Sequence, residues 1–259
     1  MVRFARCALT LALVALAPAC NNAPAVDPAE QAAQLKKDLT NATARVADEK
    51  WKEAEGMLQR VLAAEPNNPD AQHLMAQVRL FGDKNPAEAL TLIDKAIATK
   101  GDVAEFHATR GAVLDKSEKH AESAAAWGKA FELKPDNGNY GLHQGQAFKK
   151  AKQFDKAEAA FREVIKVDEA VQYVYSELGD ALREQGKLDE ALTTYAKAMI
   201  KYQGDKMAHA GAAQVYEAKG DTLNAVSEWS TYVRMDCCSD FSNNVAKKRI
   251  TELQGGKPG

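Results

Sequence analysis

One segment of this chain reads Tyr175-x2-Leu178-Gly179-x2-Leu182-x8-Ala191-x3-Tyr195-x2-Ala198, with small and large apolar residues at fixed intervals. The spacing returns, with variations, about every 34 residues. Its most regular part is a small residue, a large one four positions later, and a small or branched one three positions after that. These triads are Ala54/Leu58/Val61, Ala89/Ile93/Ala96, Ser123/Trp127/Ala130, Ala157/Phe161/Val164, Ala191/Tyr195/Ala198 and Ala225/Trp229/Tyr232. Offsets of four and three place each triad on one helix face, so the sequence predicts an array of helical repeats.

This spacing resembles the tetratricopeptide repeat, a helix-turn-helix unit in which small residues let two helices approach and large ones fill the gaps. The resemblance implies an all-α fold, a right-handed superhelix of about six repeats. A bundle of amphipathic helices would also carry apolar stripes, but would not keep one phase over six units. We expect a repeat domain over 31–254, with units 35–68, 69–103, 104–137, 138–171, 172–205 and 206–239, a capping helix over 240–254, and a disordered tail over 255–259.

Turn-forming residues support the same period. The expected turns between units fall at Pro66, Gly101, Pro135, Glu169, Gln203 and Cys237. Pro is excluded from helix interiors, so the three turn-type residues Pro66, Gly101 and Pro135 favour this division, and the same period continues to the other three positions. One extra residue falls between Gly82 and Pro86, where we expect a longer turn within the repeat. Gly186 and Gly220 suit a left-handed conformation in the corresponding turns of later units.

The last helix has an apolar face that would cover the end of the array. Phe241, Val245, Ile250 and Leu253 are expected to point inward. Lys247, Lys248 and Arg249 are expected to point outward.

The N-terminus has the order of a secretory leader. Arg3 and Arg6 precede an uncharged, mainly apolar run, and residues 17–19 have the small-x-small form of a cleavage site, giving a signal peptide over 1–19. Cys20 follows directly, so the segment resembles a lipobox, in which the cysteine is lipidated. We expect an outer-membrane lipoprotein facing the periplasm, with residues 20–30 as a lipidated cysteine and linker. The alternative is a soluble periplasmic protein released at the same bond.

Composition excludes one class of partner. The formal net charge is −2, and removal of the leader's two arginines makes the chain more acidic. Such a domain has no general attraction to nucleic acid. Cys237 and Cys238 are adjacent at the last turn between units, where they could form a disulfide, bridge two chains or remain thiols.

No catalytic motif accompanies the repeats. The five histidines form no His-Glu-x-x-His pair, and no nucleophile elbow or phosphate-binding loop occurs. We expect no metal ion, no cofactor and no small-molecule substrate. An enzyme with a site invisible in the sequence is the remote alternative.

The resemblance further implies that first helices line a concave groove that binds a peptide or helix of another protein. The residues expected in this groove are His73, Gln77, Phe81, Leu142, Gln146, Tyr173, Arg183, Met207 and Gln214. The Lys and Asn pair with which some family members hold a C-terminal carboxylate is missing. Apolar and amide side chains better suit an extended segment or an amphipathic helix.

Leader, linker and repeats together resemble the pilotin-type lipoproteins that assist secretin assembly in type IV pilus systems. We therefore expect a membrane-anchored scaffold whose partners are other envelope proteins. Adaptors of gliding, polysaccharide-export or cell-wall machinery have the same architecture and remain alternatives.

Overall fold

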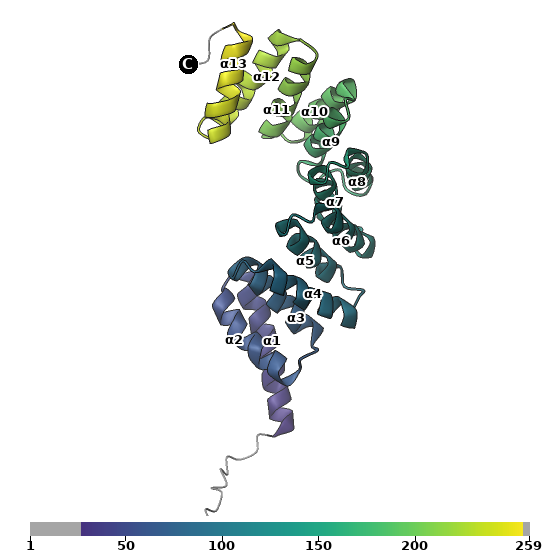
Figure 1. The fold of residues 1–259 in the computed structure, drawn as a ribbon, viewed down its shortest axis with the longest axis vertical. Helices are drawn as coiled ribbons and strands as arrows, with labels where there is room; N and C mark the ends of the chain where they lie inside the picture. The colour runs from purple at the N-terminus through teal and green to yellow at the C-terminus, as the bar shows by residue number, and fades with distance from the viewer. Residues whose placement is uncertain (1–26, 256–259) are drawn as a thin grey trace, which may run out of the picture.

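The computed structural model describes residues 27–255 of the chain. Within this range the chain is helical throughout, with thirteen α-helices and two π-helical segments in a curved stack (Figure 1). The helices of the first three repeats are α1 (Pro28–Ala47), α2 (Trp51–Ala64), α3 (Pro69–Gln77) with η1 (Val78–Gly82), α4 (Pro86–Thr99), α5 (Ala104–Lys116) and α6 (His120–Leu133). Those that follow are α7 (Gly138–Lys150), α8 (Phe154–Val167), α9 (Val174–Glu184), α10 (Leu188–Lys201), α11 (Lys206–Ala218), α12 (Thr222–Met235), η2 (Ser242–Ala246) and α13 (Lys247–Leu253).

Consecutive helices pack as antiparallel pairs, and each pair packs on the next, as expected for a tetratricopeptide superhelix. All six positions expected between units lie in turns or bends between helices. Within each pair, three residues separate the two helices, and one of them is left-handed. Gly186 (φ +75°) and Gly220 (φ +73°) take this role as expected. Glu49, Lys84, Glu118 and Lys152 take it in the other repeats, at φ between +53° and +59°.

The extra residue of the second repeat lies in a helix, and the expectation of a longer turn was wrong. Five π-helical residues, Val78–Gly82, extend α3 before a turn of ordinary length. The amide of Asp83 donates to the carbonyl of Val78 at 3.1 Å, and that of Asn85 donates to Arg79 at 2.8 Å. A π-turn absorbs one residue by widening the helix, so the register of the following helix is unchanged.

Large side chains of the second helices fill the space between repeats, as the triads predict. Leu58, Ile93, Phe161 and Tyr195 are fully buried, and Trp229 is nearly so. Trp127 is the exception among the six, because it is only half-buried.

Glycines on the first helices make this packing possible. A Cβ at Gly179 would lie 2.5 Å from the Tyr195 ring, and one at Gly211 would lie 2.3 Å from it. Tyr195 is therefore enclosed between α9 and α11. A Cβ at Gly145 would likewise lie 2.3 Å from the Phe161 ring.

The structure corrects the expected boundary at the N-terminal end. Helix α1 begins at Pro28, inside the stretch 20–30 expected as linker and ahead of residue 35 where the first unit was placed. Asp27 caps the helix, because its carboxylate accepts from the amide of Ala29 at 2.9 Å, and Pro28 takes the first helical position. The capping residue determines where this helix starts, and the 34-residue period of the repeats does not predict that position.

The capping helix also differs in detail. Ser242 and Ala246 are buried, whereas Phe241 and Val245 are 37% and 38% exposed. The π-helical turn over Ser242–Ala246 displaces the inward face by one residue from the face of a regular helix. Arg249 was expected to point outward, yet it forms ion pairs with Glu217 of α11 and with Glu252.

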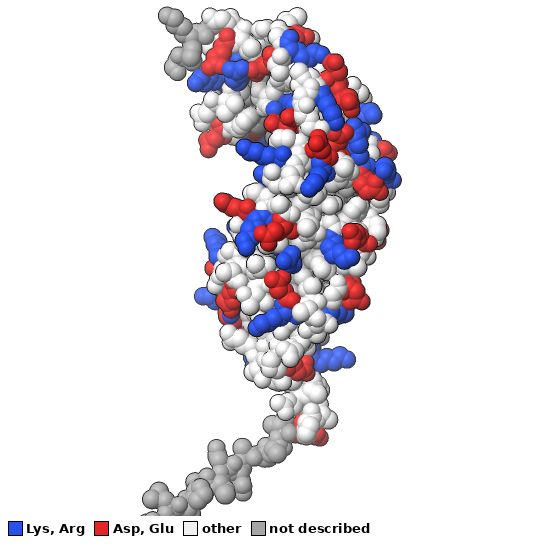
Figure 2. Space-filling model, turned by 45° about the vertical axis from the view of Figure 1, so that its right-hand side comes forward, with Lys and Arg blue, Asp and Glu red and all other residues white. Residues whose placement is uncertain are grey.

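The first and last repeats lean toward the same side of the stack, so the molecule has a concave edge (Figure 1). Positive and negative side chains are interspersed over the face in Figure 2, without a large patch of one sign. This agrees with the near-neutral composition of the chain.

Candidate functional site: a groove across the first helices

Three hollows lie in a row along the first helices of the repeats. The first is lined by Leu80, Phe81, Lys84, Pro86 and Lys116. The second shares Phe81 and Lys116 with it and continues through Ala112, Asp115, Trp127, His143, Gln146, Ala147 and Lys150. The third shares Gln146 and continues through Tyr173, Ser176, Glu177, Asp180 and residues 204–207. The three hollows thus follow one another from the second repeat to the sixth, and we call this row the groove.

Aromatic side chains form the N-terminal half of the groove. Phe81 is 47% exposed, because the π-helical turn ends the first helix of its repeat at the groove edge. Trp127 lies beyond it, with its ring 4.6 Å from His143 and 6.0 Å from Tyr140. These half-buried rings offer apolar surface to a bound segment without being closed off by the core.

Tyr173 and Met207 are the exposed apolar residues of the C-terminal half, at 43% and 51% exposure. The connection from α8 to α9 spans residues 168–173, longer than the four-residue connections between the neighbouring repeats. It ends with Tyr173 at φ +66°, a left-handed conformation that is unusual for a bulky residue. Such strain persists only where the surroundings impose it, and here it places the ring at the groove.

A polar network fixes the groove floor between α7 and α9. The Lys149 ammonium lies 2.7 Å from both Glu177 and Asp180, and the Gln146 amide donates to Glu177 at 2.9 Å. Burial alone would lower the pKa of Lys149, but the Asp180 and Glu177 carboxylates raise it above its usual value. The Tyr195 hydroxyl donates to Asp180 at 2.7 Å, which ties the network to the core.

The groove residues expected from the sequence do not all share one surface. Phe81, Gln146, Tyr173 and Met207 line the groove. Leu142 is 8% exposed and packs in the core with Phe161 and Val164, so it offers little surface to a partner.

His73 and Gln77 are held between helices α3 and α5. The His73 Nε2 atom lies 2.9 Å from the Thr109 hydroxyl and 3.0 Å from the Gln77 amide nitrogen, and its ring packs on Phe106 at 4.7 Å. Arg183 is half-buried and pairs with Glu184 at 2.8 Å. Gln214 is half-buried on α11. None of these four lines the three hollows.

Two parts of the groove were not foreseen. Trp127 fills its expected place against Gly111, where a Cβ would lie 2.8 Å from the indole, and it also lines the groove, which was not expected. Asp205 and Lys206 at the start of α11 also line it. The buried Asp205 carboxylate accepts from the Ser176 hydroxyl and from the Ala208 amide. The sequence does indicate that Asp205 caps the start of a helix, because Asp is a common capping residue. It does not indicate that this helix start lines a groove.

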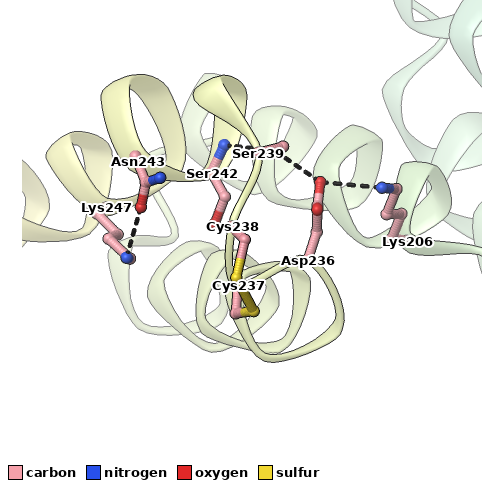
Figure 3. Close-up of a disulfide and its surroundings, with 8 residues drawn as sticks. All are labelled: Lys206, Asp236, Cys237, Cys238, Ser239, Ser242, Asn243 and Lys247. Atoms are coloured by element: carbon pink, nitrogen blue, oxygen red, sulfur yellow. Dashed lines mark hydrogen bonds and ion pairs between the residues drawn. A yellow bond between two sulfur atoms is a disulfide. The ribbon is translucent and has the colours of Figure 1, made fainter.

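Cys237 and Cys238 are joined as a disulfide in the turn after α12 (Figure 3). Beside them, the Asp236 carboxylate lies 2.9 Å from the Lys206 ammonium and accepts from the Ser239 hydroxyl at 2.7 Å. Hydrogen bonds from Lys206, Ser239 and Tyr232 lower the pKa of Asp236 to about 2. The turn thus links the capping helix to the start of α11.

Cys20 and the rest of the expected leader lie outside the described residues. Across residues 27–255, none of the helices is long and apolar enough to cross a membrane. The same residues contain no cluster of three or more His, Cys, Asp or Glu side chains placed to hold a metal ion.

Two family profiles, both described as tetratricopeptide repeat, match the chain. One matches residues 142–206 and 176–230, and the other matches residues 45–113. With the repeated helix pairs, these matches show that the chain belongs to the tetratricopeptide repeat family. No curated protein sequence matches it.

Solved structures with similar folds include PilF of Pseudomonas aeruginosa, with a TM-score of 0.66 and 16% identity over 88% of this chain and 100% of that one. PilW, described as a widely conserved type IV pilus biogenesis factor, has a TM-score of 0.68 and 19% identity, covering 82% of this chain and 97% of its own. YrrB, described as a repeat protein with an unusual peptide-binding site, has a TM-score of 0.59 and 19% identity, covering 73% and 97%. At these identities the likeness concerns the fold.

Proposed function

We propose that this chain is a membrane-anchored scaffold that binds a segment of an envelope protein in its concave groove and supports assembly of an envelope complex. The observation that carries the proposal is the row of adjoining hollows, with exposed Phe81, Tyr173 and Met207 along it. Apolar and aromatic anchors of this kind dominate the energetics of protein interfaces. The family supplies the general mode, because repeats of this class bind peptides and proteins.

The first test locates the binding face. A photo-crosslinking amino acid is placed at Phe81 or Met207 in the groove, and at exposed Ile200 or Leu223 on the second helices α10 and α12 as matched controls. In the native envelope, one partner should crosslink from both groove positions and from neither control. Crosslinks only from Ile200 and Leu223 would place the binding surface outside the groove.

We further propose that Cys20 carries the lipid anchor and that the chain faces the periplasm from the outer membrane. The leader-like order of residues 1–20 supports this. Cys20→Ser should move the protein from the membrane fraction to the soluble fraction. An unmodified Cys20 in the intact mass of the mature protein would contradict the anchor.

The complex that we propose is the secretin of a type IV pilus, which the chain would serve as a pilotin-like lipoprotein. The similarity of fold to PilF and PilW over more than 80% of this chain supports the idea. Deletion of the chain in its host should reduce assembled secretin rings, and the wild-type copy should restore them. Normal rings together with defective gliding, polysaccharide export or cell-wall growth would favour the alternative machinery.

A further inference from the structure

The two ends of the groove differ in how their charges are paired. At the N-terminal end, Lys84 and Lys116 are exposed beside Phe81, and neither forms an ion pair within residues 27–255. Leu80, Phe81 and Pro86 supply an apolar surface between the two ammonium groups. Lysines free of a partner and next to an apolar hollow favour a carboxylate that lies beside a large apolar side chain.

Every charge at the other end already has a partner. Glu177 and Asp180 share the Lys149 ammonium, Asp205 accepts from Ser176, and Lys206 pairs with Asp236. An added charge would have to compete with these contacts and would lose its own hydration. The surface left for a partner here is apolar, and it consists of the exposed parts of Tyr173 and Met207.

The fold fixes the distance between these ends. The N-terminal hollow lies between η1 and α5, and the C-terminal hollow lies between α9 and α11. Three spacings between successive first helices separate them, which is roughly 30 Å and corresponds to about nine residues of extended chain. Trp127 lies between the two ends, where its ring can contact such a segment, and Gln146 lies where the middle hollow meets the C-terminal one.

We infer that the groove selects an extended partner segment with an acidic and a large apolar residue together at one end, and an apolar anchor about nine residues away at the other. This inference rests on the proposed function, because it specifies the chemistry of the segment that the groove binds. The acidic end lies on Lys84 and Lys116, and the apolar anchor lies on Tyr173 and Met207. Charge complementarity gives the segment one orientation in the groove, since only one end attracts carboxylates.

A random library of displayed twelve-residue peptides, selected on the mature repeat domain at physiological salt, tests this inference. The selection is repeated on three variants. Lys84→Glu/Lys116→Glu reverses the charge of the N-terminal end, and Lys247→Glu/Lys248→Glu makes the same change on the capping helix as a matched control. Phe81→Ala/Tyr173→Ala removes one exposed aromatic side chain at each end of the groove. All six positions lie at least partly exposed, so these variants should fold, and circular dichroism checks that they do.

The wild type and the capping-helix control should enrich peptides with Asp or Glu next to an aromatic or large aliphatic residue, and a second apolar residue toward the opposite end. Selection on Lys84→Glu/Lys116→Glu should lose the acidic preference. For an enriched peptide, replacing Asp by Asn should weaken binding to the wild type about ten-fold and change binding to the charge-reversed variant by less than two-fold.

The other results separate the inference from the proposed function. Peptides that need Phe81 and Tyr173 but show no acidic preference would overturn the inference and leave the groove as the binding site. Enrichment that is unaffected by any groove variant, or no enrichment at all, would contradict groove binding and the inference with it.

Discussion

The imidazole of His73 lies half-buried between α3 and α5, where burial lowers its pKa to about 4 against the weaker opposing effect of Asp70 and Glu105. The folded protein therefore holds His73 neutral, bonded to Thr109 and Gln77. A histidine whose pKa is depressed in the folded state stabilises the fold above its unfolded pKa of about 6.5, and this stabilisation is lost as pH falls toward 4.

His73→Gln removes the titrating group and keeps a polar side chain of similar reach. Between pH 7 and pH 4.5, the wild type should lose about 2 kcal/mol more unfolding free energy than this variant. Urea titrations at the two pH values measure the difference. Equal losses in both proteins would mean that His73 is not held neutral by the fold.

Gly179 tests close packing at a single position. A Cβ there would lie 2.5 Å from the Tyr195 ring, whereas a Cβ at Gly56 on α2 would meet nothing within 4 Å. Gly179→Ala should lower the unfolding free energy by about 1–3 kcal/mol through overpacking. Gly56→Ala should raise it by up to about 1 kcal/mol through helix propensity. Thermal melts showing the same change for both would contradict the proposed contact.

The triads on the second helices predict buried positions because of how neighbouring repeats pack. One residue per repeat must fill the gap between neighbouring units, so its size and spacing recur. Every triad residue of α2, α4, α6, α8, α10 and α12 is buried apart from Trp127, although Ala124, Ala126, Ala160 and Thr194 are buried outside the triads. The position of the π-turn could not be predicted in this way, because an inserted residue can widen a helix or lengthen a turn without altering the period.

Trp127 of α6 and Trp229 of α12 occupy equivalent positions of their repeats, but Trp127 lines the groove and Trp229 lies in the core. Trp229 is 1% exposed and its indole N–H donates to Glu217 at 2.5 Å, so Trp229→Ala should cost about 3–5 kcal/mol. Trp127→Ala should cost at least about 1 kcal/mol less, because its side chain is only partly buried. Chemical denaturation of the two variants compares them directly. Equal costs would contradict the expectation that Trp127 contributes less packing than Trp229.

For the molecule as a whole, the sequence predicted which helices line the hollows better than it predicted which side chains do. The family register identifies the first helices as the inner face, and Phe81, Gln146, Tyr173 and Met207 do lie on it. Leu142 was expected in the groove but packs in the core, and the exposure of Trp127 to the groove was not predicted, because the curvature of the stack and the size of neighbouring residues decide which side chains stay exposed. Those are tertiary properties that a single repeat does not encode.

The central claim is that a partner segment lies in the concave groove. It is tested most directly by the affinity of the crosslinked envelope partner for Phe81→Ala/Tyr173→Ala, compared with Lys247→Ala/Lys248→Ala on the capping helix. Removal of the two anchors should weaken binding about ten-fold, or about 1.4 kcal/mol, with helicity unchanged, and the capping-helix change should leave affinity within about two-fold. Unchanged affinity in the groove variant together with lost affinity in the capping-helix variant would contradict the account and place the partner at the end of the stack.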